Sequence, residues 1–564
     1  MPRPSEKPAA PYLWAASGDV NAFFGLMLDN VAQLLLTVST LHLVFEFPTS
    51  FALRYMVPGT AIGVLVGDLF FFWLAFRLAK RTGNTTVTAM PLGLDTPSVF
   101  GIVFFVLGPA FQAAKAAGLS EHEAALQTWH IGICALFISG IFKFLCALVS
   151  NQIRRLIPRA GLLGSLAAIA LVLISFLPLL DALTAPIVGL VALAIVLLTL
   201  IARVPLPFKI PGALGALLVA GTLHYVVQWL SGSGYLPAVF LTESHEVLTA
   251  TDARAALFPT EWLTVFQFEW LGAMKLTLPY LPIVIPFALA TIVGGIDCTE
   301  SAAAAGDDYD TATVIAVESG ATLVAALCGG VIQTTPYIGH PAYKAMGGRA
   351  AYTLATAIFI GTAGVFGYFA FLYLWIPRPT VFPILVFIGL EISSQSFLAT
   401  PKRHYPAVAI ACIPALALLA SMFAGKVIGM MIGAVGFPAV NEALHDPRNH
   451  ELLFQINTLR ILSNGFIVTS VIWASALAAA IDRQLFRSSA FFAIAAGLTL
   501  FGVMHSPLAD GRMFWPSHLQ GSELKFMLHY ATGYALVALL LAAWGGHLWY
   551  HNVPIPTDPH EAHP

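Results

Sequence analysis

Apolar segments of roughly 20 residues recur along almost the whole chain, and each is long enough to cross the ~30 Å hydrocarbon core of a bilayer as a helix. Only 10% of the 564 residues are charged, whereas soluble proteins average about 25%. The spacing predicts about fourteen spans before residue 445 and about three more after it. We therefore predict an all-α polytopic protein of the plasma (inner) membrane.

One apolar segment, residues 329–341, is incompatible with a regular membrane helix. Pro336 and Pro341 each remove a backbone donor, and the glycines and β-branched residues around them weaken a helix further. We expect an extended piece ending near Gly339 or His340, then a helix with Pro341 in its first position. Irregular backbone at membrane depth requires surrounding protein or a polar cavity, so a broken span indicates a transport site. The alternative is a proline-kinked helix without a ligand.

Residues 84–98 repeat this pattern in the first half of the chain. A polar stretch is followed by an extended apolar run containing Pro91, and Pro97 then begins a helix behind the N-cap candidate Thr96. By position these would be the third and tenth spans. Broken spans at corresponding places in two halves are typical of inverted-repeat transporters.

The two halves predict the following organisation. The parts are a disordered N-terminal arm (1–18), a first inverted repeat (19–231), an acidic extracytoplasmic loop (232–275), a second inverted repeat (276–445), extra C-terminal membrane spans (446–552) and a tail (553–564).

Two helix N-termini that meet from opposite sides offer free N–H groups and positive dipole ends to an electron-rich ligand. The extended pieces add further N–H and C=O groups, which suits a planar, polar, neutral or anionic solute. Asn30 of the first span, with its neighbour Asp29, can line the same cavity, and an interhelical contact is the alternative. The predicted solute-binding residues at the breaks are Leu94, Asp95, Thr96, Ile338, Gly339 and His340.

Ionisable residues inside spans are costly and indicate function. Asp297 and Glu300 are three residues apart and share one helix face, which makes both candidates for a coupling proton or cation. Asp297 can also accept a hydrogen bond from a ligand, and the alternative for both is a solvated helix end.

Two further ionisable residues have competing interpretations. His340 is a third coupling candidate, and a helix-capping role is its alternative. Glu318 is interpreted as an acidic residue in the first turn of the next helix, where the helix dipole favours it.

Several motifs resemble the nucleobase–cation symporters, both the uracil/xanthine and the adenine/guanine/hypoxanthine permeases. The matching segments are Pro91-Leu92-Gly93-Leu94-Asp95, residues 288–295 (ALATIVGG), residues 321–330 (ATLVAALCGG), Gln333-Thr334-Thr335 and Gly347-Gly348-Arg349. The resemblance covers residues 20–440. It implies a 7+7 inverted-repeat fold, a core domain that holds the site, a gate domain, elevator-like movement and a homodimer.

The chain departs from that family where the family binds the base. Gly294 stands where the eighth span carries an acidic residue, and Ile338 or Gly339 stands where the tenth span carries another. The resemblance places Gly294 and its neighbour Gly295 at the solute, and Asp297 and His340 lie near the family's acidic positions without aligning with them. The first hypothesis is therefore a permease for a nucleobase or related heterocycle by cation symport. The second is an anion or organic-acid transporter or exchanger on the same fold.

Other classes of protein are disfavoured. A net charge of −2 argues against nucleic acid as a partner. The five cysteines have no metal-ligand spacing, so no metal site is predicted. No nucleophile–base pair is evident, and we expect a transporter that is not an enzyme and has no cofactor besides a proton or sodium ion for coupling.

Basic residues predict a cytoplasmic N-terminus. With that orientation the clusters around Arg77, Arg154, Lys344 and Lys402 all fall on the cytoplasmic side. Arg483 and Arg487 would fall on the outer side, which contradicts the positive-inside rule.

Overall fold

The computed structural model describes residues 11–147, 159–207, 210–237, 248–337, 339–398, 400–508, 511 and 513–551. Within these residues ten helices are long and apolar enough to cross a membrane, or up to 12 if each of two bent pairs counts as one span. The prediction of an all-α polytopic membrane protein is confirmed. The predicted tail, and residues 1–10 of the predicted arm, lie outside the described residues.

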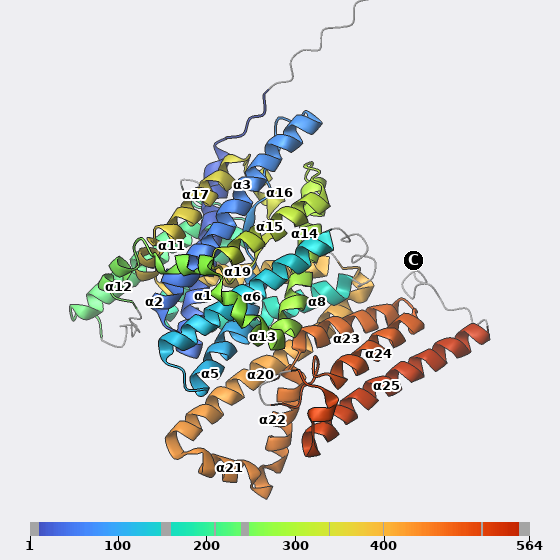
Figure 1. The fold of residues 1–564 in the computed structure, drawn as a ribbon. Coiled ribbons are helices and arrows are strands. Elements are labelled where there is room, and N and C mark those ends of the chain that lie inside the picture. The colour runs from blue at the N-terminus through green and yellow to red at the C-terminus, as the bar shows by residue number, and fades with distance from the viewer. Residues whose placement is uncertain are drawn as a thin grey trace, which may run out of the picture. The chain divides into compact units, whose positions relative to one another are not determined.

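The chain forms two compact units (Figure 1). The first comprises Met1–Ser150 with Leu177–Phe387, and the second comprises Asn151–Phe176 with Ile388–Pro564. The predicted repeat boundaries are a separate division of the chain and stay predictions.

The first unit contains the residues around both breaks. Its helices are α1 (Gly18–Phe45), α2 (Thr49–Phe51), α3 (Val57–Thr82), α4 (Thr96–Ile102), α5 (Gly108–Ala116), α6 (Glu121–Ala147), α10 (Pro186–Val196), α11 (Gly212–Gly232), α12 (Ala250–Ala255), α13 (Met274–Thr277), α14 (Leu281–Ala304), α15 (Thr311–Leu327), α16 (His340–Ala345), α17 (Ala351–Val365) and α18 (Phe369–Trp375). Helices α9 (Phe176–Ala182) and α19 (Arg378–Leu398) each cross a boundary between the units.

Both predicted breaks are present. Strand β1 (Leu92–Leu94) precedes α4, and strand β2 (Thr334–Pro336) precedes α16. The strands are antiparallel, with Leu92 opposite Pro336 and Leu94 opposite Thr334. Two extended pieces that run in opposite directions are the arrangement that inverted repeats require.

The helices after the two breaks differ in detail from the predictions. The N-cap of α4 is Asp95 rather than Thr96, because its carboxylate accepts the Ser98 N–H at 3.1 Å. Helix α4 continues through a π-helical segment into α5 as a 21-residue span, whereas α16 has six residues. Pro341 is the second residue of α16 rather than the first.

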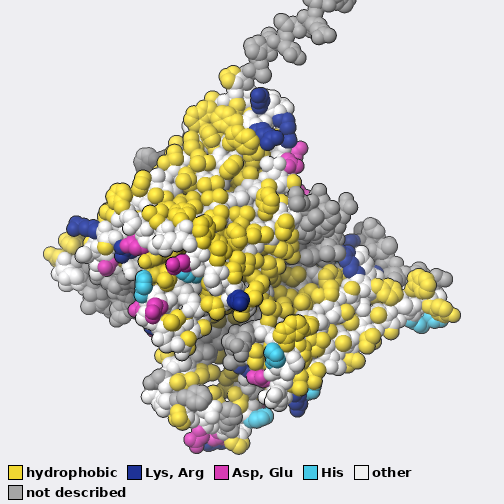
Figure 2. All heavy atoms as spheres, viewed as in Figure 1, with side chains coloured by type: hydrophobic (Ala, Val, Ile, Leu, Met, Phe, Trp, Pro, Cys, Tyr) yellow, Lys and Arg dark blue, Asp and Glu magenta, His cyan; other side chains and the backbone are white. Residues whose placement is uncertain are grey.

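Surfaces of the first unit are apolar where a membrane helix would meet lipid. On α3 the side chains of Leu69, Phe70 and Trp73 are 38%, 50% and 51% exposed. Hydrophobic side chains cover much of the face shown in Figure 2, and Lys and Arg side chains gather at the end of α3. Lys80 and Arg81 lie in the last turn of α3, where the helix dipole favours cations.

The second unit holds the C-terminal extension. Its helices are α8 (Arg159–Ile169), α20 (Tyr405–Val435), α21 (Phe437–His445), α22 (His450–Ser463), α23 (Phe466–Ile481), α24 (Leu485–Leu500) and α25 (Gly521–Tyr550). The three extra spans predicted after residue 445 correspond to α23, α24 and α25. The apolar runs at residues 405–420 and 427–440 predict two spans, whereas the structure has one 31-residue helix there, α20.

This difference corrects the predicted topology of the second unit. Asp482, just after α23, lies 3.0 Å from Arg403 and 2.7 Å from His404, just before α20. The start of α20 and the end of α23 are therefore on the same side. Arg483 consequently shares a side with Lys402, and the prediction that separated them is wrong because it counted one span too many.

Candidate solute-binding site

The outer edge of β1 is completed by side chains from two helices. Asp68 of α3 accepts the Leu92 N–H at 3.1 Å, and Asn30 of α1 accepts the Leu94 N–H at 3.0 Å. Both side chains are fully buried. Buried backbone donors must be paired, so these two residues make the extended piece possible inside an apolar unit.

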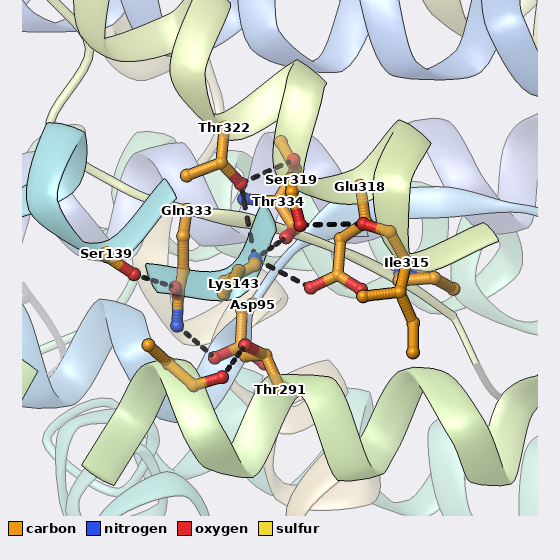
Figure 3. A network of polar contacts seen from close by, with 12 residues as sticks. Asp95, Ser139, Lys143, Thr291, Ile315, Glu318, Ser319, Thr322, Gln333 and Thr334 are labelled. Atoms are coloured by element: carbon orange, nitrogen blue, oxygen red, sulfur yellow. Dashed lines mark hydrogen bonds and ion pairs between the residues drawn. The ribbon is translucent and has the colours of Figure 1, made fainter. Parts of the chain in front are cut away.

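A buried ion pair lies beside β2. The Lys143 Nζ of α6 is 2.6 Å from Glu318 Oε1 of α15, and both side chains are 0% exposed. Nζ also donates to the Thr334 carbonyl at 3.1 Å and to the Thr322 hydroxyl at 3.3 Å (Figure 3). The ammonium group is thus held directly against the backbone of the second broken span.

A second set of polar contacts joins the two broken spans. The Asp95 N–H donates to the Gln333 carbonyl at 3.0 Å, and the Gln333 amide donates to Asp95 Oδ2 at 3.3 Å and contacts Ser98. The Ser139 hydroxyl of α6 donates to Gln333 Oε1 at 2.9 Å. Figure 3 shows Gln333 between Ser139 and Asp95. Helix α6 therefore supports the junction through both Ser139 and Lys143.

The charges of this network do not balance. Lys143 is one cation, and Asp95 and Glu318 are two carboxyl groups. Apart from the ion pair between its Oε1 and Nζ, the Glu318 carboxylate has no hydrogen-bond partner among the described residues. Its Oε2 is packed against Gly295 of α14, where an added Cβ would lie 2.9 Å away. Lys143 has Thr334 and Thr322 as further partners, whereas Glu318 depends on Lys143 alone.

The structure brings together five of the predicted site residues. Asn30, Leu94, Asp95 and Thr96 surround β1 and the start of α4, and Gly295 contacts Glu318. The other predicted residues lie elsewhere.

On α14, Asp297 and Glu300 are half-buried. A Cβ added to Gly294 would meet nothing within 4 Å. Gly339 precedes α16, and an added Cβ there would meet the Tyr337 ring at 2.5 Å. Ile338 lies outside the described residues.

His340 belongs to a separate cluster near the loop between α14 and α15. Its Nε2 is 3.1 Å from the Thr88 carbonyl and 3.3 Å from Asp307 Oδ2, and Lys344 Nζ is 2.6 Å from Asp307 Oδ1. Burial alone would raise the pKa of Asp307, but hydrogen bonds from His340, Lys344 and the Thr88 N–H lower it below its ordinary value. These contacts hold the segment that leads into β1.

Two important residues were misjudged from the sequence. Glu318 is the eighth residue of α15 rather than part of its first turn, so the helix-dipole interpretation is wrong. Lys143 received no role, although it lies inside an apolar span. Because charged residues inside membrane spans mark functional sites, the lysine in this apolar span was the sequence signal for the site.

No protein-family model and no curated protein matches this sequence. Among solved structures the fold is similar to the transmembrane domain of a cyanobacterium bicarbonate transporter, BicA, at 14% identity and a TM-score of 0.43, over 72% of this chain and 95% of that one. It is also similar to SLC26A9 at 11% identity and a TM-score of 0.43, over 72% of this chain and 62% of that one.

Proposed function

We propose that this protein is a secondary active transporter for a small carboxylate-type anion. The observation that carries the proposal is the buried Lys143 ammonium, which is bonded to the Thr334 carbonyl at the junction of the two broken spans. Charged groups at membrane depth are costly and are found where solutes or ions bind. Broken spans supply the backbone groups of such sites.

Glu318 suggests how an anion would enter. Its carboxylate has Lys143 as its counter-ion and no other hydrogen-bond partner in the part of the chain that the structure describes. A solute carboxylate can replace Glu318 on the ammonium if Glu318 takes up a proton as it leaves. Neither the lysine nor the displaced carboxyl group is then a buried charge without a partner.

The same residues favour an anion over a nucleobase. Gly294 and Gly339 have no side chains with which to accept hydrogen bonds from the N–H edge of a base. The Glu318 carboxylate that lies against Gly295 is already neutralised by Lys143. The work proposed for these residues is binding and release, without covalent chemistry.

Uptake into proteoliposomes tests the proposal. The protein is reconstituted and given labelled acetate, succinate, bicarbonate and uracil, each at two pH values and with an imposed membrane potential. We expect uptake of at least one of the three anions. Uptake of acetate or succinate would identify an organic acid as the substrate, and uptake of bicarbonate would identify inorganic carbon.

Matched lysine variants connect uptake to the site. Lys143→Met is expected to abolish anion uptake, whereas Lys115→Met, at an exposed position on α5, should leave it unchanged. Uptake of uracil with no uptake of any anion would refute the proposal and support the nucleobase hypothesis.

A further inference from the structure

A second group of unpaired polar atoms lies between α1 and β1. Asp29 is 5% exposed and Gln33 is 1% exposed. Asp29 Oδ2 and Gln33 Oε1 both lack a hydrogen-bond partner. Buried polar atoms are nearly always paired, and an unpaired carboxylate oxygen is especially costly. Both orphaned atoms are acceptors, so what they lack is a donor or a cation.

These two acceptors are neighbours. Asp29 and Gln33 are four residues apart on α1 and therefore lie on one face of the helix. The Gln33 amide nitrogen is 3.5 Å from Asp29 Oδ1. It donates to the Leu94 carbonyl at 3.0 Å and contacts the Thr96 hydroxyl. The orphaned atoms thus adjoin two more oxygens, both from the first broken span.

Gly93 carries no side chain on the side of β1 where these acceptors lie. An added Cβ on Gly93 would lie 3.5 Å from Asp29 Oδ2, 3.5 Å from Asn30 Oδ1 and 3.6 Å from the Asn30 amide nitrogen. All three distances are ordinary van der Waals contacts, so a methyl group at residue 93 would lie against the orphaned Asp29 oxygen without a clash.

Asp29 differs from the other carboxylate that lies beside a broken span. Glu318 has Lys143 as its counter-ion, whereas no basic side chain in the described parts of the chain pairs with Asp29. A cation can contact both acceptors and neutralise the carboxylate.

We propose that Asp29, Gln33 and Thr96 form a binding site for Na+ beside Gly93. All of the ligands are oxygens, which hard cations prefer, and the single carboxylate matches a single positive charge. The site rests on the proposed transport function in one respect only, because the bound ion would be the coupling ion. A Na+ ion bound there would link α1 to the first broken span, at the edge of β1 that does not pair with β2.

Direct binding of radiolabelled Na+ tests this site without any anionic solute. The full-length protein is purified into nanodiscs and Na+ binding is measured by scintillation proximity. We expect saturable binding by the wild type. Asp29→Asn keeps the shape of the side chain and removes its charge, and it should weaken binding by about tenfold or more.

Gly93→Ala is the sharper variant. Its methyl group would lie 3.5 Å from Asp29 Oδ2 and make only ordinary contacts, so the protein should fold, and the crowded carboxylate should bind Na+ less tightly. Gly221→Ala on α11 is the matched control, because an added Cβ there meets nothing within 4 Å. Thermal unfolding of each variant establishes that it is folded.

The outcomes separate this site from the proposed transport function. Lys143→Met should keep Na+ binding while it loses anion uptake. No saturable Na+ binding by the wild type, or equal binding by Gly93→Ala and Gly221→Ala, would overturn the site. Anion uptake that is driven by a pH gradient and indifferent to Na+ would assign coupling to protons and would also overturn it.

Discussion

The Nζ of Lys143 and the Oε1 of Glu318 are 2.6 Å apart and completely shielded from solvent. Neither charge is tolerable there without the other. The pair is therefore both a structural link between α6 and α15 and the only direct contact of a lysine ammonium with β2 in the described residues. Its two roles predict different consequences for stability and for transport.

Removing one member of the pair should destabilise the protein more than removing both. Lys143→Met strands the Glu318 carboxylate and is expected to cost about 3–5 kcal/mol, whereas the double variant Lys143→Met/Glu318→Met should be neutral or more stable by about 1–4 kcal/mol. Thermal and denaturant unfolding in detergent measure this. Neither variant should transport anions. Uptake by the stable double variant would show that Lys143 does not bind the solute.

Neutralising Glu318 should strengthen anion binding. In Glu318→Gln the amide oxygen can still accept a hydrogen bond from Lys143, but the ammonium no longer has a competing carboxylate. We expect the KM for the transported anion to fall severalfold in initial-rate uptake assays. A KM that stays constant or rises would contradict the exchange of solute for Glu318 on Lys143.

The cluster around Asp307 should make stability depend on pH in the acid range. Its pKa is lowered in the folded protein, so the stabilisation is complete above the unfolded-state value of about 3.9 and is lost as the pH falls through the lower folded-state pKa. The Tm of the wild type should exceed that of Asp307→Asn at pH 6, and the two should converge below about pH 4. A difference that is the same at every pH would count against this role.

The contact of Asp482 with Arg403 and His404 predicts accessibility from one side. Cysteines introduced singly by Lys402→Cys and Arg483→Cys should react with a membrane-impermeant maleimide from the same face of sealed vesicles. The positive-inside rule predicts that this face is cytoplasmic. The unaltered protein, with its five native cysteines, is the background control. Labelling from opposite faces would contradict α20 as a single crossing.

Much of the first unit could be predicted because its signals are local. Each proline removes its own backbone N–H, so the effect is readable within a few residues. Both breaks, at Pro91 and Pro97 and at Pro336 and Pro341, were therefore predicted with the correct order of strand and helix. The cap was misplaced by one residue, from Asp95 to Thr96, because Thr and Asp are similar N-caps and only the contact with Ser98 decides between them.

The C-terminal region was harder to predict because hydropathy does not show where one helix ends and the next begins. The apolar runs at residues 405–420 and 427–440 were interpreted as two spans, yet α20 continues from the first into the second. The pairing of Asp482 with Arg403 bridges distant parts of the chain and has no signature in the sequence.

The sequence by itself determined a membrane protein with two interrupted spans, because apolar length and proline chemistry act within a few residues. Only the tertiary structure decided which side chains meet the interruptions. Lys143 and Thr334 are 191 residues apart along the chain, and a buried charge chooses its partner by distance and desolvation rather than by position in the sequence. The ion pair at β2, and the orphaned oxygens of Asp29 and Gln33 at β1, therefore became visible only in the folded protein.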